Sequence, residues 1–241
     1  MAVVFRPPAH AVKIRFVLAA LGLACSSAKS AALTASETEW LAAALPVLNY
    51  AAQQQLPVDV VVQPQDTPGA PPLATGFVEG RCKLVLSMRG NPRLHEALAG
   101  VARAHVPAVI EAMTAHEIGH CWRYVHGSWQ RLPASFVEAD GELPTDAERL
   151  ERWRREMRMA RREEGFADLV GLAWTLQQRP EQYAAVHAWF TAVRHDQPVP
   201  GSHHDTRAWI RLAGDTGALA GPGNLFERAR VLWQRGLLAD D

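Results

Sequence analysis

The chain has 241 residues, enough for one domain of ordinary size, and 48% of them are hydrophobic, so it can bury a sizeable core. Its 25 basic and 25 acidic residues balance. This neutrality argues against nucleic acid or an anionic membrane surface as the main partner. No stretch reaches the roughly 18 apolar residues that a membrane-spanning helix needs, so we expect no transmembrane span in the mature chain.

The first 30 residues have the layout of a secretory signal peptide. A basic start precedes a short apolar run over residues 16–24, and small residues follow it. We expect cleavage within residues 28–32 and a mature protein that is exported, either periplasmic or secreted. A lipoprotein is the alternative, because the residues before Cys25 resemble part of a lipobox, although Gly22 stands where that signal prefers a branched aliphatic.

The segment after this leader predicts a helix over residues 36–55, with Ser36 as its N-cap and Glu39 completing a capping box. Three further elements are predicted in chain order: a β-branched strand over 58–62, a second strand over 81–88 and a helix over 93–104. A strand at the edge of a sheet can take up an extended peptide through main-chain hydrogen bonds, and the order of elements along the chain is consistent with the second strand being such an edge. We therefore expect the second strand to be able to pair with an extended peptide.

The most informative stretch is His116-Glu117-Ile118-Gly119-His120, inside a helix predicted over 107–126. Histidines four residues apart share one helix face, so both can bind one metal ion. Glu117 then stands beside the place of a reactive water, as in the H-E-x-x-H arrangement of zinc hydrolases. Gly119 costs about 1 kcal/mol relative to alanine inside a helix, and closely packed backbone would explain it. A chance match is the alternative, since the chain has 10 histidines.

Two cysteines remain if the leader is removed, Cys82 in the second strand and Cys121 directly after the second histidine. An oxidising compartment would allow them to pair and to link the sheet to the helix beside the metal. Two separate buried thiols are the alternative, because spacing alone does not establish connectivity.

A long helix is predicted from residue 145 or 146 onward, and its two halves differ. The part over 148–162 is dense in arginine and glutamate, which is typical of a solvated face, and the interleaved acids argue against nucleic-acid binding. The part over 163–174 is largely apolar. Acidic side chains in such a buried segment are costly unless they are paired or bound to a cation.

Two acids in that apolar part, Glu164 and Asp168, are four residues apart and share a face. Glu164 can complete a His-His-Glu zinc set, and Asp168 can accept the free ring N–H of a ligand histidine and orient it. Glu163 points about 100° away and is expected to be exposed. The alternative is that both acids pair with arginines such as Arg161.

The last part of the chain predicts two more helices, over 180–196 and 225–238. Between them a Gly/Ser turn presents His203 and His204 just before a short helix. One of them can donate a hydrogen bond to the oxyanion that forms during attack. We prefer His204 because it stands next to Asp205. The alternatives are surface histidines, or a segment in which Asp205 or Thr206 caps the helix.

Together these residues resemble the gluzincin metallopeptidases, in particular the CAAX prenyl-protease type. That family pairs H-E-x-x-H with a later E-x-x-A-D, and this chain carries both patterns, the second as Glu164-Gly165-Phe166-Ala167-Asp168. The resemblance implies one zinc ion on His116, His120 and Glu164. It also implies Glu117 as general base, Asp168 as the residue that orients a ligand, and a soluble exported relative. The family often has a later His-Pro pair, whereas this chain has histidines without the proline.

The sequence thus predicts an α+β fold, mostly helical, as a single zincin-like metallopeptidase domain over 31–241 with a small N-terminal sheet and an active-site helix. The expected function is a zinc-dependent endopeptidase of the cell envelope that acts on a peptide or protein substrate. Two alternatives stay open: a catalytically silent zinc-binding or scaffolding protein, and a zinc amidase acting on cell-wall peptides. Glu117 separates hydrolysis from structural binding, because a structural zinc site has no use for its carboxylate.

Overall fold

The computed structural model describes residues 3–5, 32–66, 68–127, 147–195 and 202–237. The chain divides into two compact units, Met1–Ala102 and Arg103–Asp241. Residues 28–31 of the predicted cleavage region and Cys25 lie outside the described residues, so export and lipidation stay predictions. Within the described part, no helix has both the length and the apolar character required to cross a bilayer. The structure is mostly helical with one small sheet, which confirms the α+β class.

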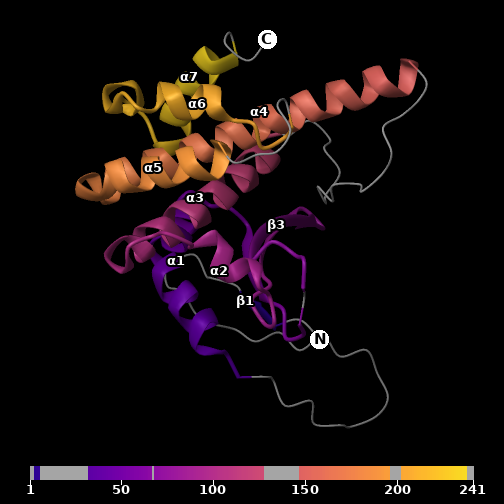
Figure 1. The fold of residues 1–241 in the computed structure, drawn as a ribbon, viewed down its shortest axis with the longest axis vertical. Helices are drawn as coiled ribbons and strands as arrows, with labels where there is room; N and C mark the ends of the chain where they lie inside the picture. The colour runs from indigo at the N-terminus through magenta and orange to yellow at the C-terminus, as the bar shows by residue number, and fades with distance from the viewer. Residues whose placement is uncertain (1–2, 6–31, 67, 128–146, 196–201, 238–241) are drawn as a thin grey trace. The chain divides into compact units, whose positions relative to one another are not determined.

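The first unit contains a mixed sheet in which β4 (Arg81–Leu86) lies between β2 (Val58–Val62) and β3 (Leu73–Val78) (Figure 1). β2 runs parallel to β4, and β3 runs antiparallel to it. A three-residue strand, β1 (Val3–Phe5), pairs antiparallel with the other side of β2. β1 belongs to the predicted signal peptide, so of the strands in the described residues a cleaved chain would keep the other three.

The position of β4 corrects one expectation. Because β4 is paired on both sides, its backbone is not a sheet edge and cannot take up a peptide by strand addition. The strand that covers it, β3, has few β-branched residues and was not predicted. A two-residue turn creates the pairing, since Glu79 and Gly80 both have positive φ, 52° and 73°, as hairpin turns of this length require.

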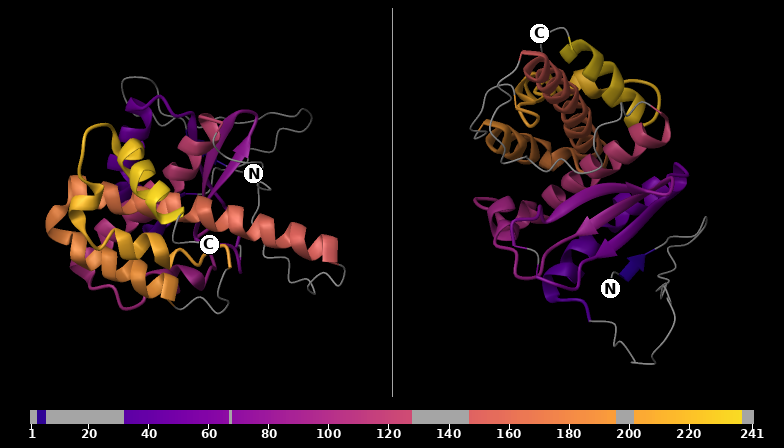
Figure 2. Two further views of the ribbon diagram at one scale, coloured as in Figure 1. Left: turned by 90° about the horizontal axis from the view of Figure 1, so that it is seen from above. Right: turned by 90° about the vertical axis from the view of Figure 1, so that its right-hand side faces the viewer.

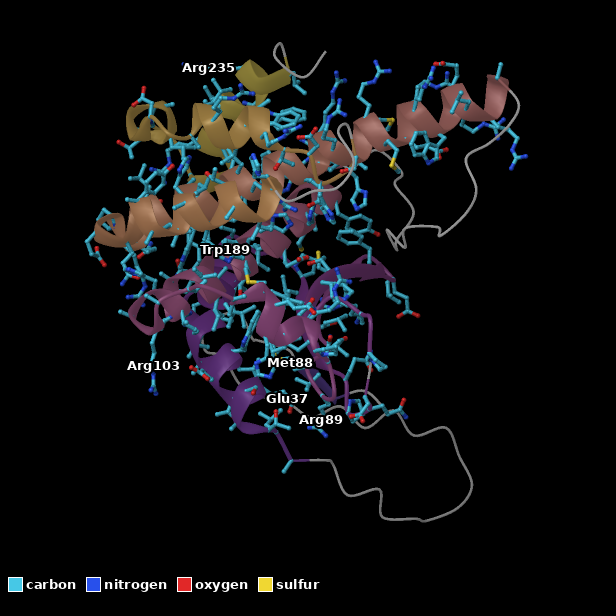
Figure 3. All side chains as sticks on the ribbon, viewed as in Figure 1. Glu37, Met88, Arg89, Arg103, Trp189 and Arg235 are labelled. Carbon is cyan, nitrogen blue, oxygen red and sulfur yellow. The ribbon has the colours of Figure 1, made fainter. Side chains whose placement is uncertain are left out.

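One helix, α1 (Ala35–Gln53), contacts β2 and buries an apolar stripe that includes Trp40 and Leu48. Its N-cap is Thr34 rather than Ser36. The Thr34 hydroxyl accepts a hydrogen bond from the Glu37 backbone, and the Glu37 carboxylate accepts one from the Thr34 backbone. Glu37 is fully buried and also binds Arg89 at 2.7 Å (Figure 3). Because Glu37 has this second partner, the capping box forms between Thr34 and Glu37 instead of between Ser36 and Glu39.

The second helix described in the first unit is shorter than predicted, since α2 covers only Arg93–Ala97.

The second unit is helical, with five α-helices among the described residues: α3 (Val106–Val125), α4 (Ala147–Gln178), α5 (Tyr183–His195), α6 (Arg207–Leu212) and α7 (Leu225–Leu237). Short 3-10 turns cover Arg103–His105, Pro180–Gln182 and Thr216–Leu219.

The long helix α4 organises the second unit. Helices α3, α5, α6 and α7 all contact it, and they gather along its C-terminal half (Figures 1 and 2). This half is almost continuously buried from Glu163 to Thr175, as its apolar sequence predicts. The N-terminal half, which is dense in charge, is mostly exposed.

Glycine allows α3 and α4 to approach each other closely at the level of the two histidines. A Cβ atom on Gly119 would lie 3.2 Å from the Cα atom of Ala167 and 3.2 Å from the Cβ atom of Val170. The expectation that packed backbone explains this glycine is therefore confirmed. α3 ends at Val125, and Gly127, the glycine predicted to stop it, follows two residues later with a φ of 66° that favours glycine.

Candidate metal centre

Helix α3 supplies the first two candidate ligands. His116 and His120 are one helical turn apart and both are buried. Their Nε2 atoms lie 3.2 Å apart, although the two rings are nearly perpendicular. The predicted spacing therefore brings two imidazole nitrogens to one point on the inner face of the helix.

Helix α4 supplies the third. The carboxylate of Glu164 lies 3.5 Å from Nε2 of His116 and 3.3 Å from Nε2 of His120. All three ligand atoms lie within 4.8 Å of one another. Ligands about 2.1 Å from a tetrahedral zinc ion are separated by about 3.4 Å, so these donors have the spacing that such an ion requires. The structure thus brings together the predicted set His116, His120 and Glu164.

Asp168 lies one turn beyond Glu164 and is fully buried. Its Oδ1 atom is 2.8 Å from Nδ1 of His116. A hydrogen bond there places the ring proton on Nδ1 and leaves the Nε2 lone pair for a metal ion. The position predicted for Asp168, behind a ligand histidine, is the position that it occupies.

Asp168 has two further partners that were not predicted from the sequence. Arg194 of α5 donates to both carboxylate oxygens at 2.7 and 2.9 Å, and to Glu164 at 3.3 Å. Thr206 donates its hydroxyl proton to Asp168 at 2.5 Å. The sequence spacing could have indicated that Arg194 is buried, because it continues the i, i+4 row of Val186 and Phe190, which are also buried. No sequence pattern pointed to the contact of Thr206 with Asp168. Its hydroxyl donates to Asp168 instead of accepting a hydrogen bond from the first turn of α6.

The neighbours of Glu164 and Asp168 keep both carboxylates ionised. Burial alone would raise the pKa of Glu164, but His120, His204 and His116 outweigh it and hold that pKa well below its usual value. Burial likewise opposes a charge on His116, yet Asp168 and Glu164 raise the pKa of its ring. The two carboxylates share the guanidinium of Arg194, and their other charged contacts among the described residues are with histidine rings.

Glu117 and His204 border the same cluster. Glu117 is half-buried between the two histidines, and its charge helps to raise the pKa of His116 and of Arg194. The Nε2 atom of His204 lies 3.7 Å from Glu164. Burial lowers the pKa of His204 to about 4, so its ring is neutral at pH 7 and has one N–H to donate. His203 is buried, with its ring centre 3.9 Å from that of His204.

The expectation that Glu163 is exposed is wrong. Its side chain is buried, and its carboxylate binds two donors of the Arg123 guanidinium. Arg123 comes from α3 and also lies over the rings of Phe166 and Trp233. Glu163 points away from the metal cluster, as the helix geometry predicts. It is buried all the same, because Arg123 of the neighbouring helix compensates its charge. The alternative pairing of Glu164 and Asp168 with an arginine also holds in part, through Arg194.

Cys82 and Cys121 are both buried, the first in β4 and the second in α3. They belong to different units of the chain. Their disulfide stays a prediction.

Comparison of the chain with protein-family models, curated proteins and solved structures finds no match. The likeness to gluzincins therefore depends on the two motifs and on the geometry of the residues that carry them.

Proposed function

We propose that the protein is a zinc-dependent peptidase of the gluzincin type, with one zinc ion held by His116, His120 and Glu164. The observation that carries this proposal is the convergence of two imidazoles and one carboxylate at tetrahedral spacing, from motifs far apart in the sequence. A buried carboxylate beside two imidazole rings also matches the ligand chemistry of a zinc site. We place its action in the cell envelope because of the predicted signal peptide.

When bound, zinc would supply Lewis-acid activation of a water molecule and of the peptide carbonyl. Glu117 acts as general base: it takes the proton from the attacking water and delivers it to the leaving amine. His204, neutral at pH 7, donates its N–H to the oxygen on which negative charge develops. Asp168 keeps His116 in the tautomer that a ligand needs, and Arg194 and Thr206 hold Asp168 in place.

Glu117 favours a hydrolase over a silent zinc-binding or scaffolding protein, because a purely structural site needs no carboxylate beside its open position. An amidase acting on cell-wall peptides would use the same residues and the same chemistry. The two enzymes would differ only in substrate, so we keep the amidase as the second candidate.

The test combines metal analysis with digestion of casein by the purified protein. We expect about one zinc per chain, and Glu117→Gln should keep the zinc while losing activity by about 10²–10⁴-fold, the usual contribution of a general base. Glu151→Gln, in the exposed half of α4, is the matched control and should retain activity. Glu164→Ala should lose zinc with the fold largely intact.

Equal digestion by the wild type and Glu117→Gln would remove the proposed mechanism. Undiminished zinc in Glu164→Ala would reassign the third ligand. If casein remains intact while cell-wall peptides are cleaved in a Glu117-dependent way, the amidase replaces the peptidase.

A further inference from the structure

A cavity of about 690 Å³ lies between α4, α5 and α6. Four of the side chains that line it are arginines, and a single acid, Asp205, faces them; we call this hollow the arginine cavity. Its four arginines are Arg161, Arg194, Arg207 and Arg211. A volume of this order is typical of sites that take up a small molecule or a few side chains of a peptide.

Arg194 connects the arginine cavity to the candidate metal centre. Arg194 is one of the residues that line the cavity, and its guanidinium lies 3.3 Å from the carboxylate of Glu164. A group bound in the cavity would therefore lie within a few residues of a peptide bond placed at the metal.

Three carboxylates lie against arginines of the cavity. Asp205 pairs with Arg207 at 2.6 Å, and Asp168 and Glu164 lie against Arg194. As a zinc ligand, Glu164 would share its charge with the ion, and less of that charge would remain to compensate Arg194.

Two of the four arginines are accessible to a ligand. The side chain of Arg207 is 48% exposed even though it binds Asp205. Arg211 is exposed and forms no ion pair with any of the described residues. Guanidinium groups recognise planar carboxylates through two parallel hydrogen bonds, so exposed arginines along a hollow favour an anionic ligand of that shape.

We propose that the arginine cavity binds an acidic side chain of the substrate, so that the enzyme selects peptides carrying Asp or Glu near the cleaved bond. The inference rests on the proposed peptidase function. Arg211 and Arg207 make the contacts that determine this selectivity, while Arg194 mainly supports Glu164 and Asp168.

The test measures binding without turnover. The zinc-loaded Glu117→Gln protein is titrated against two fluorescent peptides that differ only in Glu versus Gln at three positions, and binding is followed by fluorescence anisotropy. We expect the Glu peptide to bind about tenfold more tightly, with a preference that weakens as salt is raised. Adding Arg211→Gln or Arg207→Gln should reduce the preference to about twofold or less.

Arg235→Gln in α7 is the matched control, because this arginine is exposed but does not line the cavity (Figure 3). It should leave the preference unchanged. Equal binding of the two peptides, or an equal loss in Arg235→Gln and Arg211→Gln, would overturn the proposal. Displacement of both peptides by inorganic phosphate, without any Glu preference, would overturn it in favour of a phosphate site.

A second measurement ties selectivity to catalysis. Wild-type protein should cleave the Glu peptide with a kcat/KM about tenfold above that of the Gln peptide, and Arg211→Gln should narrow the ratio without altering the bound zinc. A ratio unchanged in Arg211→Gln would overturn the selectivity. Failure of the peptidase function itself would appear separately, as casein digestion that does not depend on Glu117.

Discussion

The Nδ1 atom of His116 lies 2.8 Å from the Oδ1 atom of Asp168, although the two residues are 52 positions apart in the chain. This contact links the H-E-x-x-H helix to the later acidic motif and leaves the Nε2 atom of His116 directed at Glu164 and His120. The ligand orientation in α3 is thus determined by a carboxylate in α4, whose own orientation depends on Arg194 and Thr206.

Replacing Asp168 should weaken metal binding. Asp168→Asn keeps the shape but loses the charge that orients His116, so we expect zinc affinity to fall by about 10–100-fold in competition with a chelator. Asp215→Asn, an exposed acid at a 3-10 turn, is the control and should bind zinc like the wild type. An unchanged affinity in Asp168→Asn would show that His116 does not need this partner.

The buried pair of Arg123 and Glu163 should be important for stability. Arg123→Met leaves the Glu163 carboxylate buried without its main partner, which should cost about 3–5 kcal/mol in the free energy of unfolding measured with denaturant. Arg154→Met breaks a pair with Glu151 whose side chains are 55% and 54% exposed, and should cost less than about 1 kcal/mol. Equal costs for the two variants would contradict this assignment.

Gly171 allows α4 to pack against its neighbours. A Cβ atom there would lie 2.8 Å from the carbonyl oxygen of Ala112 in α3 and 2.9 Å from the ring of Phe190. Gly171→Ala should therefore lower the free energy of unfolding by about 1–3 kcal/mol, despite the better helix propensity of alanine. Gly76→Ala, where no atom lies within 4 Å of the added Cβ, should be tolerated. A melting temperature unchanged in Gly171→Ala would refute the packing argument.

Asp59 should make the first unit sensitive to acid. Burial raises the pKa of this carboxyl, but hydrogen bonds from Arg81 and Lys83 outweigh it, so the pKa in the folded state is lowered. A lowered pKa stabilises the fold at pH values above the unfolded pKa of about 3.9, and this contribution disappears as pH falls through the folded pKa.

Asp59→Asn should therefore lose about 1–3 kcal/mol in urea unfolding at neutral pH, and the difference from the wild type should shrink below about pH 4. Glu79→Gln, in the exposed hairpin turn, should follow the wild type throughout. A difference between Asp59→Asn and the wild type that is independent of pH would exclude this electrostatic origin.

The predicted bridge between Cys82 and Cys121 can be checked on protein prepared from an oxidising compartment. Mass spectrometry of non-reduced peptides should show the two cysteine-containing fragments linked, and reduction should separate them. Two peptides with alkylated thiols before reduction would reject the bridge.

Most helices and two strands could be predicted from sequence, because their patterns are local. The predicted helix over 107–126 is observed as Val106–Val125, and the strand over 58–62 as Val58–Val62. The predictions failed where a local structure depends on a contact with a distant part of the chain. Leu73–Val78 becomes a strand because it pairs with β4, and the capping box of α1 begins at Thr34 because Glu37 is also bound by Arg89.

The candidate site divides in the same way. His116 and His120 face one point because four residues make one helical turn, and the apolar surroundings of Glu164 and Asp168 already indicated buried acids that need partners. Which cations meet these acids was decided only in three dimensions. Arg194 reaches Asp168 from α5 and Arg123 reaches Glu163 from α3, since the partner of a buried charge depends on which helices pack together, and the local sequence around each acid does not contain that information.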